Sequence, residues 1–315
     1  MPFRGFGEKD LRIAMLGMVE GNGHPYSWSA IFNGYDPGEM ARCPYPTIPD
    51  YLGKQPKNSL GIPGARITHI WTDNPEDAGR VARASLIPAI VDTPEAVIGA
   101  VDAVIVATDI GHEHVARCRP FVEAGVPVFV DKPLVDNGAD LAVFRRWHDE
   151  GRPIMSSSCM AYAKEFFPYR ESTHDLGELR LAVSSTMKSW ERYGIHALSA
   201  VYPVVGPGFL EVRHSGGVAH FTHERGVEVL VAAIDDMYGA FGKLMICGTQ
   251  GTAFAEFQDT YGAFRAQLLA FVQFLRTGVC PVPFEETEEL MRMIIAAIVS
   301  RDRSGAPVRL CDIAS

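Results

Sequence analysis

The first half of the chain alternates short apolar runs with amphipathic stretches. The runs are rich in β-branched residues and show little polar alternation, which is typical of strands buried on both faces of a parallel sheet. They lie at Leu11–Gly17, Arg66–Trp71, Ala89–Val91, Val101–Ala107 and Val126–Val130. Apolar residues recur with helical spacing between them, at Pro75–Arg83, Thr93–Gly99, His114–Ala124 and Gly138–Glu150. This order predicts an α/β fold with a Rossmann-type, doubly wound parallel sheet.

The pattern changes after Gly151. Longer runs with polar and apolar residues in alternation predict a largely antiparallel sheet, at Glu178–Ser189, Gly208–His214, Gly217–Glu224, Val227–Ala233, Lys243–Cys247 and Thr252–Phe257. Two amphipathic helices, Ala263–Thr277 and Glu285–Arg301, are expected to cover one face of it. We therefore expect a dinucleotide-binding domain over residues 1–150 and an α+β C-terminal domain over residues 151–315.

One segment interrupts the first domain. Residues 34–65 lie between a first helix at about Ser27–Asn33 and the second strand, and they are rich in proline and glycine. An inserted loop of this length is uncommon and usually functional or mobile. Its position would bring it near the cofactor or a subunit contact, so we expect either a lid or a neutral surface excursion.

Composition and charge narrow the class of protein. The 315 residues are 47% hydrophobic and 21% charged, which excludes a disordered or fibrous chain. A net charge of −9 offers no broad basic surface to nucleic acid or to anionic lipid. No apolar stretch approaches the ~20 residues of a membrane span, and the run Leu11–Val19 lacks a cleavage site for a signal peptide. We expect a cytoplasmic protein without nucleic-acid or membrane partners.

The six cysteines are scattered and include no C-x-x-C pair, so they predict reduced thiols and neither a zinc site nor a disulfide framework.

Glycines after the first strand point to a dinucleotide. They precede a helix, a context in which backbone N–H groups cradle a pyrophosphate. Cofactor contacts are therefore predicted at Gly17, Met18, Gly21, Asn22, Gly23 and His24. Because the spacing differs from G-x-G-x-x-G, a purely structural turn stays open as an alternative. Asp73 ends the second strand with no adjacent arginine, which predicts bonds to the adenosine ribose and favours NAD over NADP.

Two later strands also end in polar residues. The carboxyl ends of parallel strands form the ligand-binding edge of a doubly wound sheet, so cofactor contacts are predicted at Thr108, Asp109, His112, His114, Asp131, Lys132 and Pro133. Lys132 would also lie beside a substrate hydroxyl. His112 and His114 have no acidic or cysteine partner with metal-binding spacing, so no metal site is predicted.

Four further motifs run along the chain: Asp131-Lys132-Pro133, Tyr193-Gly194-Ile195-His196, Gly248–Thr252 and the tail from Phe271 to Val308. Together, over nearly the whole chain, they resemble the glucose–fructose oxidoreductase, inositol dehydrogenase and rhizopine catabolism (Gfo/Idh/MocA) oxidoreductase family. The resemblance implies that residues 151–315 bind substrate and mediate oligomerisation, as a homodimer or homotetramer. It also implies catalytic roles for Lys132 and His196.

The chain departs from this family beside the histidine. Arg192 stands where the family has an aspartate, and Ser199 replaces a second acidic residue. At helical spacing Arg192, His196 and Ser199 would share one face, so the guanidinium would disfavour a protonated imidazole. Neutral His196 could then accept a hydroxyl proton while Lys132 stabilises negative charge on the oxygen. A buried core histidine with no catalytic role is the alternative.

Further substrate contacts are expected at Tyr162, Lys188, Trp190, Glu191 and Arg192. The position of Tyr162 lines the substrate cleft in relatives, although a packed tyrosine is equally compatible. Lys188, Trp190 and Glu191 precede the histidine and could contact sugar hydroxyls and a ring face.

The sequence thus predicts an NAD-dependent dehydrogenase acting on CH–OH groups, in carbohydrate metabolism. It would pass a hydride between nicotinamide and a secondary alcohol or ketone of a sugar, cyclitol or related polyol. Two alternatives remain. One is a redox-assisted lyase or glycosidase with tightly bound NAD. The other is an inactive dinucleotide-binding sensor, which the altered glycine turn and Arg192 favour.

Overall fold

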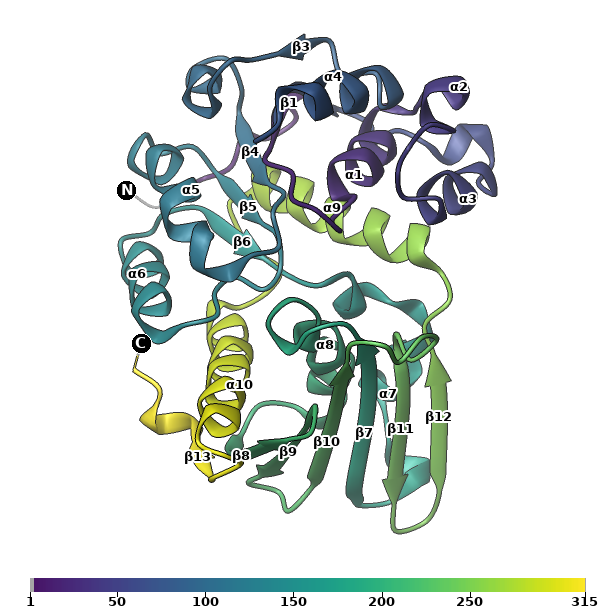
Figure 1. The fold of residues 1–315 in the computed structure, drawn as a ribbon, viewed down its shortest axis with the longest axis vertical. Helices are drawn as coiled ribbons and strands as arrows, with labels where there is room; N and C mark the ends of the chain where they lie inside the picture. The colour runs from purple at the N-terminus through teal and green to yellow at the C-terminus, as the bar shows by residue number, and fades with distance from the viewer. Residues whose placement is uncertain (1–2, 315) are drawn as a thin grey trace.

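The computed structural model describes residues 3–314, apart from the side chain of Lys57, and contains two β-sheets (Figure 1). The first has six parallel strands in the order β3-β2-β1-β4-β5-β6. They are β1 (Leu11–Leu16), β2 (Ala65–Trp71), β3 (Ala89–Ile90), β4 (Ala103–Val106), β5 (Val128–Val130) and β6 (Ile154–Ser156). The strand order reverses between β1 and β4, where a doubly wound sheet binds its ligand. The predicted Rossmann-type sheet is confirmed.

Helices connect these strands: α1 (His24–Asn33), α4 (Pro75–Ala84), α5 (His114–Glu123) and α6 (Gly138–Asp149). The start of α4 follows from its sequence, because the Asn74 side chain accepts from Glu76 N and a proline occupies the first turn. The helix predicted over Thr93–Gly99 is only a 3₁₀ turn, Pro94–Val97.

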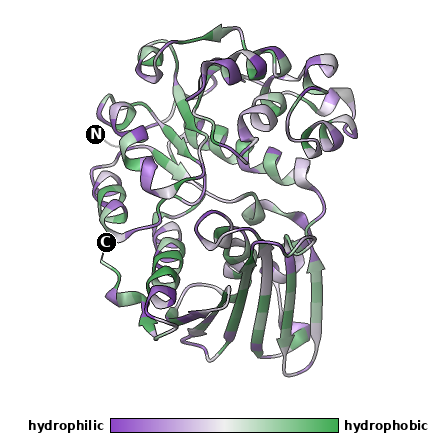
Figure 2. Cartoon of the chain, in the orientation of Figure 1, coloured by the Kyte–Doolittle hydropathy of each residue, from purple (hydrophilic) through white to green (hydrophobic). Residues whose placement is uncertain are grey.

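The second sheet has seven strands in the order β12-β11-β7-β10-β9-β8-β13. They are β7 (Leu179–Met187), β8 (Phe209–Ser215), β9 (Val218–His223), β10 (Glu228–Ile234), β11 (Lys243–Gly248), β12 (Thr252–Glu256) and β13 (Val308–Arg309). Neighbours run antiparallel except β7 and β10, which are parallel. Bands of alternating hydropathy run along these strands in Figure 2. The largely antiparallel sheet is therefore confirmed, and α8 (Ile195–Val205) packs against β7.

The last two long helices, α9 and α10, pack against different parts of the fold. Helix α10 (Phe284–Asp302) packs against β8 and α6, whereas α9 (Thr260–Thr277) runs beside the first sheet (Figure 1). The ring of Phe271 lies 5.3 Å from that of Phe129 in β5, and Gln267 Nε2 donates to Ser157 O at 2.6 Å. The expectation that both helices cover the second sheet is therefore wrong for α9, because its aromatic stripe finds partners on the first.

Strand β6 also follows residue 150 in the chain and completes the first sheet. The chain thus crosses between the two sheets more than once. The division at residue 150 stays a prediction.

The inserted segment is a folded unit. It contains α2 (Pro37–Met40), α3 (Thr47–Gly53) and a 3₁₀ turn at Lys57–Ser59. Its buried side chains, each at most 8% exposed, are Met40, Cys43, Ile48, Leu52 and Ile62. The Tyr261 hydroxyl of α9 donates to Ser59 O at 2.5 Å, which ties the segment to α9. The expected irregular loop is corrected, because these apolar side chains anchor it in the core.

All six cysteines are free thiols. Within residues 3–314, no helix is both long and apolar enough to cross a membrane.

Because the inserted segment is part of the core, shortening one of its anchors should lower the free energy of unfolding. Leu52 is fully buried, so Leu52→Ala should cost about 2–5 kcal/mol in a urea titration. Leu210 is 51% exposed, and the matched variant Leu210→Ala should change stability by less than about 0.5 kcal/mol. Equal stability of both variants would show that the segment is a neutral excursion.

Candidate functional site

The turn after β1 has the geometry of a dinucleotide cradle. Gly17 has a φ of +87°, and a Cβ there would lie 2.7 Å from Thr108 Cγ2 after β4. Gly21 has a φ of +79°, and the nearest atoms to its place for a Cβ are the Arg192 guanidinium nitrogens at 3.6 and 3.7 Å. Glycine is needed at both positions because L side chains rarely adopt this backbone. A close turn with a cation beside it suits the pyrophosphate of a dinucleotide.

Asn22 and His24 join the turn to the loop after β5. Asn22 Nδ2 donates to Asp131 Oδ2 at 2.9 Å and to Ala107 O at 3.2 Å, and His24 Nδ1 lies 2.5 Å from the same Asp131 oxygen. The His24 ring stacks on Trp28 at 4.2 Å. Asn22, His24 and Asp131 therefore form one polar cluster that holds the turn after β1 against the loop after β5.

Gly23 serves packing. A Cβ on it would lie 2.5 Å from Ile48 Cδ1 and 2.7 Å from Tyr45 Cδ2, both in the inserted segment.

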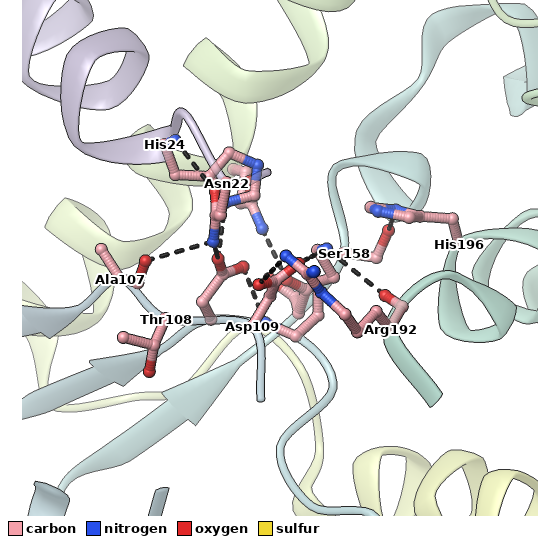
Figure 3. Close-up of polar contacts among 12 residues, drawn as sticks. Asn22, His24, Ala107, Thr108, Asp109, Ser158, Arg192 and His196 are labelled. Atoms are coloured by element: carbon pink, nitrogen blue, oxygen red, sulfur yellow. Dashed lines mark hydrogen bonds and ion pairs between the residues drawn. The ribbon is translucent and has the colours of Figure 1, made fainter. Parts of the chain in front are cut away.

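A second cluster joins the two halves of the chain (Figure 3). The Asp109 carboxylate, 1% exposed, accepts from Arg192 Nη2 at 2.7 Å and from Arg192 Nε at 3.1 Å. Lys132 Nζ lies 3.5 Å from Asp109 Oδ2 and donates to Arg192 O at 3.4 Å. Arg192 Nη2 also donates to Glu20 O in the glycine turn at 3.0 Å. Arg192 thus links the second half of the chain to the cofactor turn.

Each charged group in this cluster stabilises the ionised form of its oppositely charged neighbours. Burial alone would raise the pKa of Asp109, but Lys132 and Arg192 outweigh it and lower that pKa. Burial alone would lower the pKa of Lys132, but Asp131 and Asp109 outweigh it and raise that pKa. Lys132 therefore stays cationic and is suited to hydrogen-bond an oxygen that gains negative charge.

His196 lies at the start of α8, beside the turn Trp190–Gly194, which is π-helical. Its Nδ1 lies 2.8 Å from Ser158 Oγ, and its ring meets those of Tyr193 and Phe241 edge-on, both at 5.1 Å. Burial, followed by the charges of Lys132, His24 and Lys188, lowers its pKa well below the ordinary value. His196 is therefore neutral near pH 7, and no partner for Nε2 is found among the described residues.

This geometry corrects the expected coupling between Arg192 and His196. The π-helical turn breaks the helical spacing between them, and Arg192 points to Asp109 while His196 contacts Ser158 (Figure 3). Arg192 is absent from the groups that lower the pKa of His196. The neutral imidazole that the sequence predicted has a different cause, mainly burial.

Asp73 ends β2 as expected, but an arginine lies beside it. Met18 N donates to Asp73 Oδ2 at 3.2 Å, and Arg117 Nη2 from α5 donates to Asp73 Oδ1 at 2.8 Å. Arg117 also pairs with Glu113 at 2.8 Å. No arginine is adjacent to Asp73 in the sequence, but Arg117, 44 positions later, becomes its neighbour in the fold.

Several predicted contacts point elsewhere. The ring nitrogens of buried His114 lie 2.9 Å from Leu134 O and 2.8 Å from Thr108 O, so this residue braces two loops. His112 faces outward with a 64% exposed side chain and lies 2.9 Å from Asp136. These contacts occupy both histidines, and we do not retain them as cofactor ligands.

Two expected substrate residues face α10. Trp190 is 3% exposed and donates through Nε1 to Ile294 O at 3.1 Å, while Glu191 pairs with Arg301 at 2.7 Å. Lys188 stays near the site, because its Nζ donates to the Tyr193 hydroxyl at 2.7 Å.

A cavity of about 260 Å³ adjoins the cluster, with Lys132, Ser158 and Ser199 in its wall. Tyr162 also lines this cavity. Among the described residues, no group of three or more His, Cys, Asp or Glu side chains could hold a metal ion.

Sequence reasoning missed Ser158 and Arg117. Ser158 follows β6 at the ligand-binding edge of the sheet, so its position after a parallel strand was an available signal. No local pattern distinguishes Arg117 from the other arginines, because its partners come from the fold.

Residues 50–146 match the model of an oxidoreductase family with an NAD-binding Rossmann fold, Gfo/Idh/MocA. No curated protein matches the sequence.

Solved structures share the fold of nearly the whole chain. Scyllo-inositol dehydrogenase from Lactobacillus casei is 11% identical, with a TM-score of 0.76 over 97% of this chain and 100% of that one. Myo-inositol dehydrogenase from the same organism, in complex with NAD(H) and myo-inositol, is 14% identical with a TM-score of 0.71 over 95% and 96%. An oxidoreductase from Agrobacterium radiobacter, in complex with NAD+, L-tartaric acid and magnesium, is 16% identical with a TM-score of 0.72 over 96% and 99%.

The glycine turn and the strand order are those of a dinucleotide-binding Rossmann fold. Residues 50–146 match the NAD-binding Rossmann domain of the Gfo/Idh/MocA oxidoreductase family.

Proposed function

We propose that this protein is an NAD-dependent dehydrogenase that oxidises a secondary alcohol, or reduces the corresponding ketone, of a sugar, cyclitol or related polyol. One observation carries the proposal: a buried, cationic Lys132 and a buried, neutral His196 lie at the carboxyl edge of the sheet, beside the cofactor turn. A hydrogen-bond donor for the substrate oxygen and an acceptor for its proton are the two groups that alcohol oxidation needs.

The cofactor fits the residues present. The turn from Gly17 to Gly21 would hold the pyrophosphate, Asp73 the adenosine ribose, and the Asn22–Asp131 cluster would keep the turn in register. When bound, the dinucleotide supplies the hydride acceptor for oxidation or the hydride donor for reduction.

The protein's own groups handle the proton and the charge. Lys132 Nζ donates to the substrate oxygen and stabilises the negative charge that develops there. His196 Nε2 accepts the hydroxyl proton, while Ser158 at Nδ1 fixes the orientation of the ring. Burial excludes water from both groups and strengthens their interaction with the substrate.

The proposed substrate class draws support from the inositol dehydrogenases among the structural relatives, one of them solved with myo-inositol. A homodimer or homotetramer and a role in carbohydrate metabolism are part of the same proposal. Calorimetric titration with NAD, followed by a panel of polyols monitored for NADH, tests it. Tight NAD binding with NADH formation is expected. Binding without conversion of any substrate would favour a sensor, and conversion without net NADH would favour a redox-assisted lyase or glycosidase.

Lys132→Ala should lower kcat by about 10²–10³-fold, because it removes a preorganised donor to the reacting oxygen. The Kd for NAD, from the same titration, should remain measurable. Near-wild-type turnover in this variant would remove Lys132 from the mechanism.

The acidic limb of the kcat/KM profile should report His196, because protonation removes the acceptor. Lys188 contributes to the lowered His196 pKa, so Lys188→Met should raise that pKa and move the limb to higher pH. Arg192→Gln should leave the limb in place and weaken NAD binding, since Arg192 contacts the cofactor turn. A limb that persists in His196→Ala would assign proton transfer to another group.

Asp73 should make NAD bind more tightly than NADP, because its carboxylate repels a 2′-phosphate. Asp73→Ser frees Arg117 from its 2.8 Å bond and should tighten NADP binding by at least about tenfold. Fluorescence titration gives the Kd values. In the double variant Asp73→Ser, Arg117→Gln this gain should vanish, and a gain that survives would place the ribose elsewhere.

A further inference from the structure

The cavity beside Lys132 contains polar groups that the proposed chemistry does not use. It lies among the chain after β6, helix α8 and the first turn of α10. Lys132 and Ser158 form one part of its wall, and Arg170, Tyr162, Ser157 and Glu286 form others. A ligand here would therefore touch Lys132 and the serine that holds His196. Its volume of about 260 Å³ is small for a ligand site and suits a molecule of monosaccharide size.

Arg170 is a largely buried cation without an acidic partner. Its Nη2 donates to Met160 O at 2.6 Å and its Nη1 to Ala161 O, so main-chain carbonyls occupy both terminal nitrogens. Its Nε is buried and has no hydrogen-bond partner, and no carboxylate within residues 3–314 forms an ion pair with this guanidinium. Burial lowers the pKa of Arg170 to about 10. The fold holds a cation here at a cost that an anionic partner would offset.

Two hydroxyl groups in the same cavity wall are also short of partners. Tyr162 Oη and Ser157 Oγ are buried beside each other, and neither has any other hydrogen-bond partner among the described residues. Burial raises the pKa of Tyr162 to about 12, with the neighbouring Ser157 hydroxyl and the Arg170 charge acting in the opposite direction. Tyr162 thus remains a neutral hydroxyl that can donate. Buried polar groups in native proteins nearly always have partners. An unpaired guanidinium Nε and two hydroxyls that have only each other, all around one cavity, therefore point to a ligand.

The charge of the cavity decides the class of that ligand. Glu286 is the one carboxylate in the described wall, and it lies on the exposed first turn of α10. Glu286 forms no ion pair with Arg170, and its pKa is raised by burial and by the charge of Glu289. Arg170, Tyr162 and Ser157 together offer donors that a carboxylate with two acceptor oxygens would satisfy. A neutral polyol would leave the guanidinium without its counter-charge.

We propose that the substrate is a sugar acid, a polyhydroxy carboxylate whose carboxylate binds Arg170, Tyr162 and Ser157 in the cavity beside Lys132. This inference rests on the proposed dehydrogenase function and narrows its substrate class from polyols in general. A hydroxyl of the same molecule would lie on the Lys132 side.

The test compares matched pairs that differ only in the acidic group: D-gluconate with D-glucitol, D-galactonate with galactitol, and D-glucuronate with D-glucose. We expect the NAD-loaded protein to bind and oxidise acids in preference to their neutral partners. Arg170→Gln should lower kcat/KM for the preferred acid by roughly 10- to 100-fold, the usual effect of losing a charged hydrogen bond. Its effect on the neutral partner should stay within about twofold.

Two further variants test the proposal independently, in case Arg170→Gln does not fold. Tyr162→Phe removes a hydroxyl whose one hydrogen-bond partner among the described residues is the Ser157 hydroxyl, so the fold should tolerate it while affinity for the acid falls. Glu286→Gln removes a negative charge from the mouth, and should increase affinity for the acid in calorimetric titration.

Equal use of acids and neutral partners, or an equal effect of Arg170→Gln on both, would overturn the carboxylate assignment and leave the dehydrogenase standing. Failure of NAD to bind would overturn both. Weaker affinity of the Glu286→Gln variant for the acid would contradict the proposal, because removal of a negative charge should favour an anionic ligand.

Discussion

The Asp109 carboxylate is the centre on which the site depends. It is buried at the end of β4 and held by two cations from different parts of the chain, Lys132 after β5 and Arg192 before α8. An isolated buried charge is costly, and removal of one member of such a group typically destabilises by about 3–5 kcal/mol. The cluster therefore positions Lys132 and also connects the second half of the chain to the glycine turn.

This arrangement keeps Lys132 cationic and His196 neutral. Acidic residues on two loops keep Lys132 protonated despite full burial, and the resulting positive charge adds to burial in keeping His196 neutral. In the proposed mechanism, Lys132 and His196 therefore supply a donor and an acceptor for one substrate oxygen without any change of protonation on binding. The adjoining cavity also contains a cation, Arg170, which has no acidic partner within the part of the chain that the structure describes.

The parts of the fold that the sequence predicted well are those determined by local pattern. The apolar runs of the first sheet and the alternation of the second predicted the strands. Contacts between residues far apart in the sequence could not be predicted. Helix α9 has an amphipathic stripe that fits either sheet, and Arg117 meets Asp73 only after folding. The proline-rich segment at residues 34–65 was predicted to be a lid or a surface excursion. Its few apolar residues, including Leu52, instead anchor it in the core. A π-helical turn has no simple sequence signature, so the placement of Arg192 relative to His196 was missed.

The most direct measurement of the central claim is the pKa of His196 in the wild-type protein, by ¹⁵N NMR titration of the imidazole, with the signal assigned by its loss in His196→Gln. A buried imidazole close to Lys132 should remain neutral through pH 6 and titrate well below the ordinary value of 6.5. A His196 that titrates at or above 6.5 would contradict the account, because the charge cluster would then not prepare an acceptor beside Lys132.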